Sequence, residues 1–166
     1  CKSSPKSGSA TSGSEMAALS WPEHGPFFRS SLSIRFAHCD PAGIIFFPQY
    51  LVLFNGLVED WFNQALAHPY AQMLGHERTG LPIVHLECDF RAIARMGDAV
   101  HLDLAVQKLG SRSLELVLRC VGADGVIRAV ARKVLVFTSL DSHQAVAVPG
   151  PIRVAIERWM AGGDAQ

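Results

Sequence analysis

One carboxylate stands in a turn directly ahead of a dense apolar helix pattern in this chain of 166 residues. The turn is the DPAG segment at 40–43, and the helix pattern follows the FFP segment at 46–48. Proline is favoured at the first helical position, because its missing N–H would have no helical partner there. If Pro48 takes that position, Phe47 is the N-cap, and its side chain cannot accept the hydrogen bonds that Ser or Asp would accept.

Backbone N–H groups that no side chain caps, together with the positive end of the helix dipole, form a site for an anion or a developing oxyanion. The Asp40 carboxylate lies a few residues upstream, in a turn that can fold back toward these groups. A carboxylate and a carbonyl-polarising N–H are sufficient for attack on an activated acyl group. The simpler interpretation is that Asp40 only starts a turn, as Asp commonly does before Pro. The spacing alone leaves both interpretations open.

Histidine and cysteine side chains are weaker candidates for chemistry. His38 and Cys39 could form a nucleophile pair, but adjacent residues of an extended segment point to opposite sides. We expect His38 to be a buried, hydrogen-bonded residue that lines the site. His76, His85 and His101 show no metal-ligand spacing and are expected at the surface, so no metal site is predicted.

Hydrophobic periodicity indicates which elements must position these groups. Alternation of apolar and polar residues predicts a strand at 32–37, and residues 49–67 predict a helix that is apolar nearly all round. Such a helix must be largely enclosed, and Gly56 within it suits the close approach of another backbone. Further strands are expected at 84–95, 100–107, 114–120 and 126–137, and a short helix at 151–160. Short turns make neighbouring strands antiparallel, so the pattern predicts an α+β fold in which a long antiparallel sheet wraps around a central helix.

The composition disfavours several functional classes. Fifteen Lys and Arg residues balance fifteen Asp and Glu residues, so the chain lacks the basic excess typical of nucleic-acid-binding proteins. No apolar run approaches the ~20 residues of a membrane span, and no membrane insertion is expected. Cys1, Cys39, Cys88 and Cys120 have no CxxC spacing, and three of them lie within apolar patterns. This usage suits reduced thiols in the cytoplasm.

The N-terminal region differs in composition from the rest of the chain. Residues 1–15 are mostly Ser, Gly and Lys, with no large apolar side chain that could anchor them. We interpret residues 1–26 as a disordered N-terminal segment or a cloning remnant. Residues 27–166 are expected to form a single domain, which is long enough to bury a core.

Two stretches of the sequence resemble a known family. The segment FAHCDPAGIIFFPQY, at 36–50, is similar to the signature of the 4-hydroxybenzoyl-CoA thioesterase family of hotdog-fold proteins. The segment TGLPIVHLECDFRAIARMGDAVHL, at 79–102, resembles the second strand of that family and the turn into its third. The resemblance covers roughly residues 32–140. It implies the hotdog fold, hydrolysis of acyl-CoA thioesters, and no metal or redox cofactor.

The resemblance also implies roles for individual residues. Asp40 matches the catalytic carboxylate, which in the family either attacks the thioester or activates water. Phe47 matches the residue whose backbone N–H polarises the thioester carbonyl; some relatives have Tyr there, so this chain lacks a phenol at that position. The phosphates of CoA need positive charge, and residues 91–133 hold eight basic and four acidic side chains. Lys108 and Arg112 flank a turn whose position resembles that of basic CoA contacts in the family.

The sequence therefore predicts an acyl-CoA thioesterase. Phe46, Phe47 and the apolar helix face indicate an apolar acyl pocket, so aromatic or medium-chain esters should be better substrates than acetyl-CoA. A homodimer or homotetramer is expected, because one sheet cannot cover the apolar helix and because the family resemblance implies sites at subunit interfaces. The alternative function is a hotdog protein that binds acyl-CoA without hydrolysing it. Dehydratase chemistry is disfavoured, since the histidine motif of those enzymes is not apparent.

Overall fold

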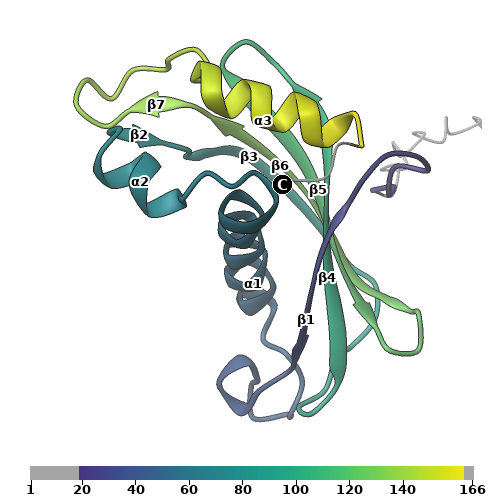
Figure 1. The fold of residues 1–166 in the computed structure, drawn as a ribbon. Helices are drawn as coiled ribbons and strands as arrows, with labels where there is room; N and C mark the ends of the chain where they lie inside the picture. The colour runs from purple at the N-terminus through teal and green to yellow at the C-terminus, as the bar shows by residue number, and fades with distance from the viewer. Residues whose placement is uncertain (1–18, 163–166) are drawn as a thin grey trace, which may run out of the picture.

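The computed structural model describes residues 19–162, in which five strands form an antiparallel sheet that curls around one long helix (Figure 1). The strands of this sheet are β1 (Phe28–Ser33), β3 (Ile83–Phe90), β4 (Ala99–Leu109), β5 (Ser113–Gly122) and β6 (Ile127–Val136). The helices are α1 (Phe47–Asp60), which continues as a π-helical turn (Trp61–Ala65), α2 (Tyr70–Gly75) and α3 (Gly150–Met160). A 3-10 turn (Phe36–His38) and a short pair of strands, β2 (Thr79–Gly80) and β7 (Thr138–Ser139), complete the fold. The α+β class predicted from the sequence is confirmed.

The strand order of the sheet is β1-β4-β5-β6-β3, so β1 and β3 are its two edges. The strands β4, β5 and β6 form the antiparallel meander that their short turns predict. The short turn at 97–98 implied that β3 lies next to β4, but this is wrong, because β3 pairs with β6 instead. After β3 the chain crosses the end of the sheet: Ile45 N–H donates to Ala94 O (2.9 Å), and Arg95 pairs with Ile44. This crossing contacts the segment that leads into α1.

The core lies between α1 and the inner face of the sheet (Figure 1). Phe54, Trp61 and Phe62 are completely buried there. β6 contributes Ala129 and Ala131 to the same core, and these small side chains leave room for the aromatic rings of the helix. At the far end of α1, the Trp61 ring packs edge-on against Trp159 of α3, with 5.4 Å between the ring centroids.

Two predicted element boundaries differ from the structure. The strand expected at 32–37 is β1, which ends at Ser33, and residues 36–38 form the 3-10 turn. Strand pairing stops there because Ile34 already exchanges hydrogen bonds with the 97–98 turn, at 2.8 and 2.9 Å. The central helix begins at Phe47, two residues before the range that the periodicity predicts and one before the start expected at Pro48, and it changes to π geometry after Asp60. No helix within residues 19–162 has both the length and the apolar character needed to span a membrane.

Part of the expected N-terminal segment lies against the outer face of the sheet. Leu19 N–H donates to Asp89 Oδ2 (2.9 Å), and the Arg119 guanidinium lies 4.0 Å from the centre of the Trp21 ring. Residues 19–26 therefore contact the domain, although the sequence analysis assigned them to the N-terminal segment. Residues 1–18 lie outside the described residues, and so does the prediction of disorder that concerns them.

Candidate active site

The DPAG segment forms the tight turn of a short hairpin that leads into α1. Gly43 N–H donates to Asp40 O (2.9 Å), and Asp40 N–H donates to Ile44 O (3.0 Å). Gly43 has a φ of +72°, a left-handed conformation that glycine adopts without a steric penalty. Cys39 and Ile45 pair across the two arms of the hairpin. The residue types of the turn thus dictate the hairpin, and the hairpin sets the direction in which α1 begins.

The half-buried carboxylate of Asp40 is only partly used by the turn. Its Oδ1 accepts a hydrogen bond from Ala42 N–H (2.8 Å), which is an Asx turn. Its Oδ2 has no hydrogen-bond donor within residues 19–162. Asp40 therefore stabilises the turn and also presents one free oxygen, so the geometry accommodates both interpretations of this residue.

The start of α1 carries one open backbone donor. Phe46 is the N-cap and Phe47 the first helical residue, one position earlier than predicted, and the Phe46 side chain makes no capping hydrogen bond. Phe46 N–H donates to His38 O (2.9 Å), and Gln49 N–H donates to Phe46 O (2.8 Å). Pro48 has no N–H. This leaves Phe47 N–H, which meets no acceptor in the described part of the chain and can donate to a substrate oxygen.

An aromatic wall adjoins this donor. Phe46 and Phe47 are 48% and 56% exposed, and their ring centroids lie 5.4 Å apart. The Phe90 ring of β3 lies 5.9 Å from Phe47 and 5.7 Å from Tyr50. Burial raises the pKa of the Tyr50 hydroxyl well above its ordinary value, so this group stays neutral. Exposed aromatic rings beside an open N–H suit an apolar acyl group that carries a polar carbonyl.

His38 and Cys39 do not form a nucleophile pair in the structure. His38 Nδ1 accepts a hydrogen bond from Arg35 N–H (3.1 Å), and Cys39 Sγ lies 3.4 Å from Arg35 O. His38 is hydrogen-bonded as expected, but it is half-buried rather than fully buried. Among residues 19–162, no cluster of three or more His, Cys, Asp and Glu side chains could hold a metal ion.

Lys108 and Arg112 lie far from Asp40 within one chain. β4 begins at Ala99, next to the turn that contacts the Asp40 region, and Lys108 stands nine residues further along. At about 3.3 Å per residue, this separates Lys108 from that turn by roughly 30 Å. Arg112 follows in the exposed turn after β4. A single chain does not bring these cations to Asp40, and their contact with CoA stays a prediction.

One polar pair, between the buried Lys133 and Asn55 of α1, was not anticipated from the sequence. Lys133 is 1% exposed, and its Nζ donates to Asn55 Oδ1 of α1 (2.6 Å). Burial lowers the pKa of Lys133 to about 8. The signal was present in the alternation of β6, where Lys133 is in register with the inward-facing Ala131 and Leu135. From the sequence, Lys133 is only one of several basic residues between 91 and 133.

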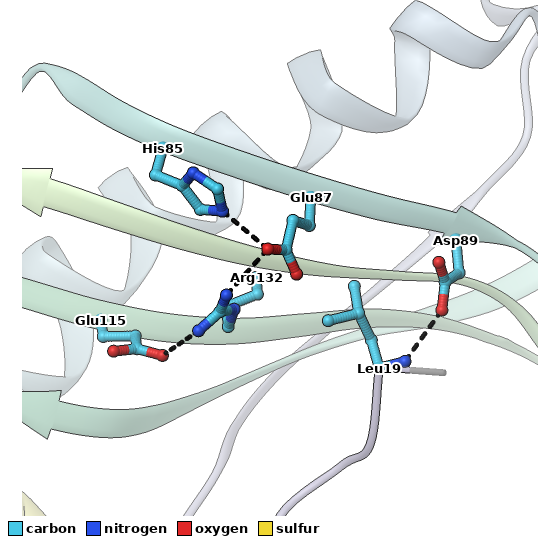
Figure 2. Close-up of polar contacts among 6 residues, drawn as sticks. All are labelled: Leu19, His85, Glu87, Asp89, Glu115 and Arg132. Carbon is cyan, nitrogen blue, oxygen red and sulfur yellow. Dashed lines mark hydrogen bonds and ion pairs between the residues drawn. The ribbon is translucent and has the colours of Figure 1, made fainter. Parts of the chain in front are cut away.

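The outer face of the sheet holds a different kind of polar cluster (Figure 2). Arg132 donates to Glu87 (2.8 Å) and to Glu115 (3.1 Å), and His85 contacts Glu87 at 2.7 Å. These side chains are partly exposed, and their charges compensate each other. The expected surface position of His85 is confirmed. The cluster offers paired charges rather than an open reactive group.

Comparisons with known proteins place this geometry in a family. Residues 34–156 match the model of the thioesterase-like superfamily. The chain belongs to this family. It is 26% identical over 118 residues to a 1,4-dihydroxy-2-naphthoyl-CoA hydrolase from Nostoc punctiforme, a match that covers 70% of this chain and 79% of the relative.

Solved structures show the same fold. A 1,4-dihydroxy-2-naphthoyl-CoA thioesterase from Synechocystis aligns with a TM-score of 0.73 at 23% identity, over 79% of this chain and 96% of that one. A gentisyl-coenzyme A thioesterase aligns with a TM-score of 0.69 at 21% identity, over 76% of this chain and 99% of that one. The predicted hotdog fold and family are confirmed, and so is the enzyme class, an acyl-CoA thioesterase. The roles assigned to individual residues remain predictions.

Proposed function

We propose that this protein hydrolyses aromatic acyl-CoA thioesters to the free acid and CoA, with Asp40 as the catalytic carboxylate. The observation that carries the proposal is the free Oδ2 of Asp40, on a hairpin that leads directly to the open N–H of Phe47. The two groups have complementary tasks, because one activates or delivers a nucleophile and the other stabilises the charge that attack creates.

The proposed reaction begins when the thioester oxygen accepts a hydrogen bond from Phe47 N–H. This bond and the helix dipole stabilise the negative charge of the tetrahedral intermediate. As a general base, Asp40 takes a proton from a water molecule whose oxygen attacks the carbonyl carbon; as a nucleophile, it forms a mixed anhydride that water then hydrolyses. In both routes the C–S bond breaks, and CoA leaves as a thiolate that takes up a proton. Neither route needs a metal or a redox cofactor.

An aromatic acyl group fits the surroundings of this site best. Phe46, Phe47 and Phe90 offer exposed rings next to the open donor, and aromatic pairs gain stability beyond the area they bury. The relatives described above have names that specify 1,4-dihydroxy-2-naphthoyl and gentisyl substrates, both aromatic. Acetyl-CoA should be a poor substrate, since each buried CH₂ contributes about 0.8 kcal/mol of binding that acetyl lacks.

The working form in this proposal is a homodimer joined through β3. Among residues 19–162, β6 is the one strand that pairs with this sheet edge, which exposes large apolar side chains: Ile83, Val84, Leu86 and Phe90. Natural sheet edges are usually short, charged or covered, so an apolar edge of 8 residues calls for a partner. A second copy of the chain, related by a two-fold axis, can cover this edge: the two β3 strands then pair in antiparallel fashion, and the sheet continues from one subunit into the other.

The proposed dimer also gives Lys108 and Arg112, which lie far from Asp40 of their own chain, a position near the Asp40 of the partner subunit. Ile83, Leu135, Leu114 and Leu109 lie level across the sheet, so the turn of Lys108 and Arg112 is at the end where β3 begins. Antiparallel pairing brings the other end of the partner's β3 to this level, and with it the partner's Asp40 turn. CoA phosphates held by Lys108 or Arg112 would then belong to a thioester that reacts in the partner.

We place this reaction in the cytoplasm, where reduced thiols such as Cys39, Cys88 and Cys120 are the rule.

Release of free thiol from a panel of acyl-CoAs tests the proposal. The panel holds 1,4-dihydroxy-2-naphthoyl-, benzoyl-, octanoyl- and acetyl-CoA, with EDTA present to exclude adventitious metal catalysis. We expect the largest kcat/KM for an aromatic ester and the smallest for acetyl-CoA. Tight binding of these esters without thiol release would favour the alternative of a non-catalytic acyl-CoA-binding protein, in which Asp40 only forms the Asx turn with Ala42. Equal kcat/KM values across the panel would refute the aromatic preference.

A further inference from the structure

Three large apolar side chains are exposed at the end of the molecule where α1 begins. Phe36 lies in the 3-10 turn after β1, and Ile93 and Met96 lie in the crossing after β3. Their side chains are 82%, 51% and 55% exposed. Single apolar side chains are common on protein surfaces, whereas several gathered at one place indicate contact with another apolar body.

Backbone hydrogen bonds hold the two loops that carry these side chains against each other. Gly97 N–H donates to Ile34 O (2.8 Å), directly ahead of the 3-10 turn. Met96 N–H donates to Gly43 O (3.0 Å), in the turn that carries Asp40. Figure 1 shows the end of β1, the start of β4 and the start of α1 together at this end of the molecule. The apolar side chains therefore surround one fixed part of the fold.

Two arginines accompany the apolar side chains. Arg35 precedes Phe36, Arg95 precedes Met96, and both arginines are exposed. Within residues 19–162, neither guanidinium pairs with a carboxylate. The nearby carboxylate of Asp98 accepts the backbone N–H of Arg95 instead (2.8 Å). The whole chain has no net charge, so attraction to an anionic surface must come from a local group of this kind.

We propose that Arg35, Phe36, Ile93, Arg95 and Met96, here called the loop patch, attach the protein to the surface of an anionic lipid bilayer. The apolar side chains enter the headgroup region, and the guanidinium groups stay at its surface, where they bind lipid phosphates. This is attachment to one leaflet, which needs no spanning helix. None of the five residues belongs to β3, the strand that joins the proposed dimer, or to the groups assigned to catalysis.

The size of the loop patch favours a lipid surface over a protein partner. A stable protein interface takes about 20 to 30 residues from each side, together with a matching shape. A few apolar side chains on loops, flanked by cations, are sufficient for weak and reversible binding to a fluid, anionic surface. The cytoplasmic leaflet of a cell membrane has this charge.

Co-sedimentation with vesicles tests the attachment. The full chain is mixed with vesicles of phosphatidylcholine, either pure or in equal parts with phosphatidylglycerol, and the bound fraction is measured at low and high salt. We expect the partition constant to be larger for the mixed vesicles and to fall with salt, because salt screens the attraction between guanidinium groups and phosphates. Absence of binding to the mixed vesicles at millimolar lipid would overturn the proposal.

Two variants and two matched controls assign the binding to the loop patch. Arg95→Gln should weaken binding to the mixed vesicles about fivefold, and Phe36→Ser should weaken it roughly tenfold. The controls are Arg158→Gln and Val154→Ser, which change exposed residues of α3 at the other end of the molecule and should bind like wild type (Figure 1). Thermal unfolding checks that each variant is folded. Equal losses in the controls, or no loss in the two variants, would contradict the proposal.

Fluorescence and light scattering test what the loop patch contacts. Phe36→Trp places an indole in the loop patch, and we expect its emission to shift to the blue on mixed vesicles and to be quenched by brominated lipid. Val154→Trp should show neither effect, and an unshifted Phe36→Trp would refute insertion. If wild type ignores the vesicles but Phe36→Ser lowers the molar mass of the oligomer, the loop patch joins two copies of the chain and the proposal is wrong. These measurements need no turnover, so their outcome is independent of the proposed function.

Discussion

The two faces of the sheet bury charge in opposite ways. On the outer face, Asp103 is completely buried, yet both of its oxygens are paired with guanidinium groups of Arg29 and Arg119, at 2.7 to 3.0 Å. On the inner face, Lys133 is buried with one amide oxygen as its contact. Within residues 19–162, the outer charge is compensated by opposite charges, whereas the inner charge has no carboxylate partner.

The pKa values express this difference. Burial by itself would raise the pKa of Asp103, but hydrogen bonds from Arg29 and Arg119 hold it below its ordinary value. Burial lowers the pKa of Lys133 to about 8, and no carboxylate of the described residues pairs with its ammonium. A compensated buried charge can be tolerated for structural reasons alone, but an uncompensated one costs stability. We therefore expect the outer face to serve the fold and the inner face, with the open N–H of Phe47, to serve a ligand.

The largest effect should come from Asp40→Asn, at the inner site. Asn keeps the Asx turn with Ala42 but cannot act as an anionic nucleophile or base. Turnover per folded molecule should fall on the order of 10² to 10⁴-fold, the usual range for the loss of a general base, while stability and substrate affinity change little. Single-turnover kinetics on folded protein measure this. Near-native turnover would leave Asp40 as a turn residue only.

Asp103→Asn, on the outer face, should show the reverse pattern. Two guanidinium groups lose the charge that compensates them, and the free energy of unfolding should fall by about 3 kcal/mol. Because the folded pKa of Asp103 is lowered, its contribution is present above the ordinary value of 3.8 and is lost as the pH falls through the folded pKa. Urea unfolding at pH 7 and pH 3 should therefore show a smaller difference from wild type at the lower pH. A large loss of turnover in folded protein would contradict the assignment of the two faces.

Lys133→Met should stabilise the protein at neutral pH by about 2 kcal/mol, because it removes a buried charge that no carboxylate of the described residues compensates. Below pH 8 the wild type bears the full cost of a buried ammonium. Between about pH 8 and 10.5 the unfolded chain retains the proton that the folded chain has lost, so wild-type stability rises with pH and the advantage of Met disappears. Burial also raises the pKa of the neighbouring Cys88 thiol to about 11, so this thiol lowers stability above its ordinary pKa in wild type and variant alike, and its effect cancels in the difference between them. The free energies of unfolding of wild type and Lys133→Met, measured at pH 7 and pH 10, give the sign of the difference at each pH. A variant that is less stable at pH 7 would mean that Lys133 is compensated after all.

The smallest effect should come from Glu115→Gln in the outer cluster. Arg132 keeps its contact with Glu87, and both groups are partly exposed to water (Figure 2). The loss should be less than about 0.5 kcal/mol, as is usual for surface ion pairs, and it should shrink further in 0.5 M salt. Thermal unfolding at low and high salt provides the measurement. A loss as large as that of Asp103→Asn would mean that the two outer clusters are not distinct.

Local patterns along the chain determined much of this protein. The alternation of β4, β5 and β6, with short turns between them, was enough to predict an antiparallel meander. The apolar helix was also predictable, as was the turn around Asp40, because DPAG residues favour a turn. A helix start without a capping side chain was predicted too, although the N-cap is Phe46 and not Phe47. These features depend on interactions between residues close in sequence, and such interactions leave a periodic or positional pattern.

Only the tertiary structure decided which distant segments meet. β3 was expected next to β4, but it pairs with β6 at the far edge, because the residues after Phe90 cross the end of the sheet instead of turning back. That position leaves an apolar edge open and places the Lys133 ammonium against Asn55, 78 residues away in sequence. A strand pattern specifies which side chains share a face but not which strand lies alongside, since pairing energy is similar for many apolar neighbours. The free oxygen of Asp40 and the uncompensated charge of Lys133 therefore became visible only with the chain folded.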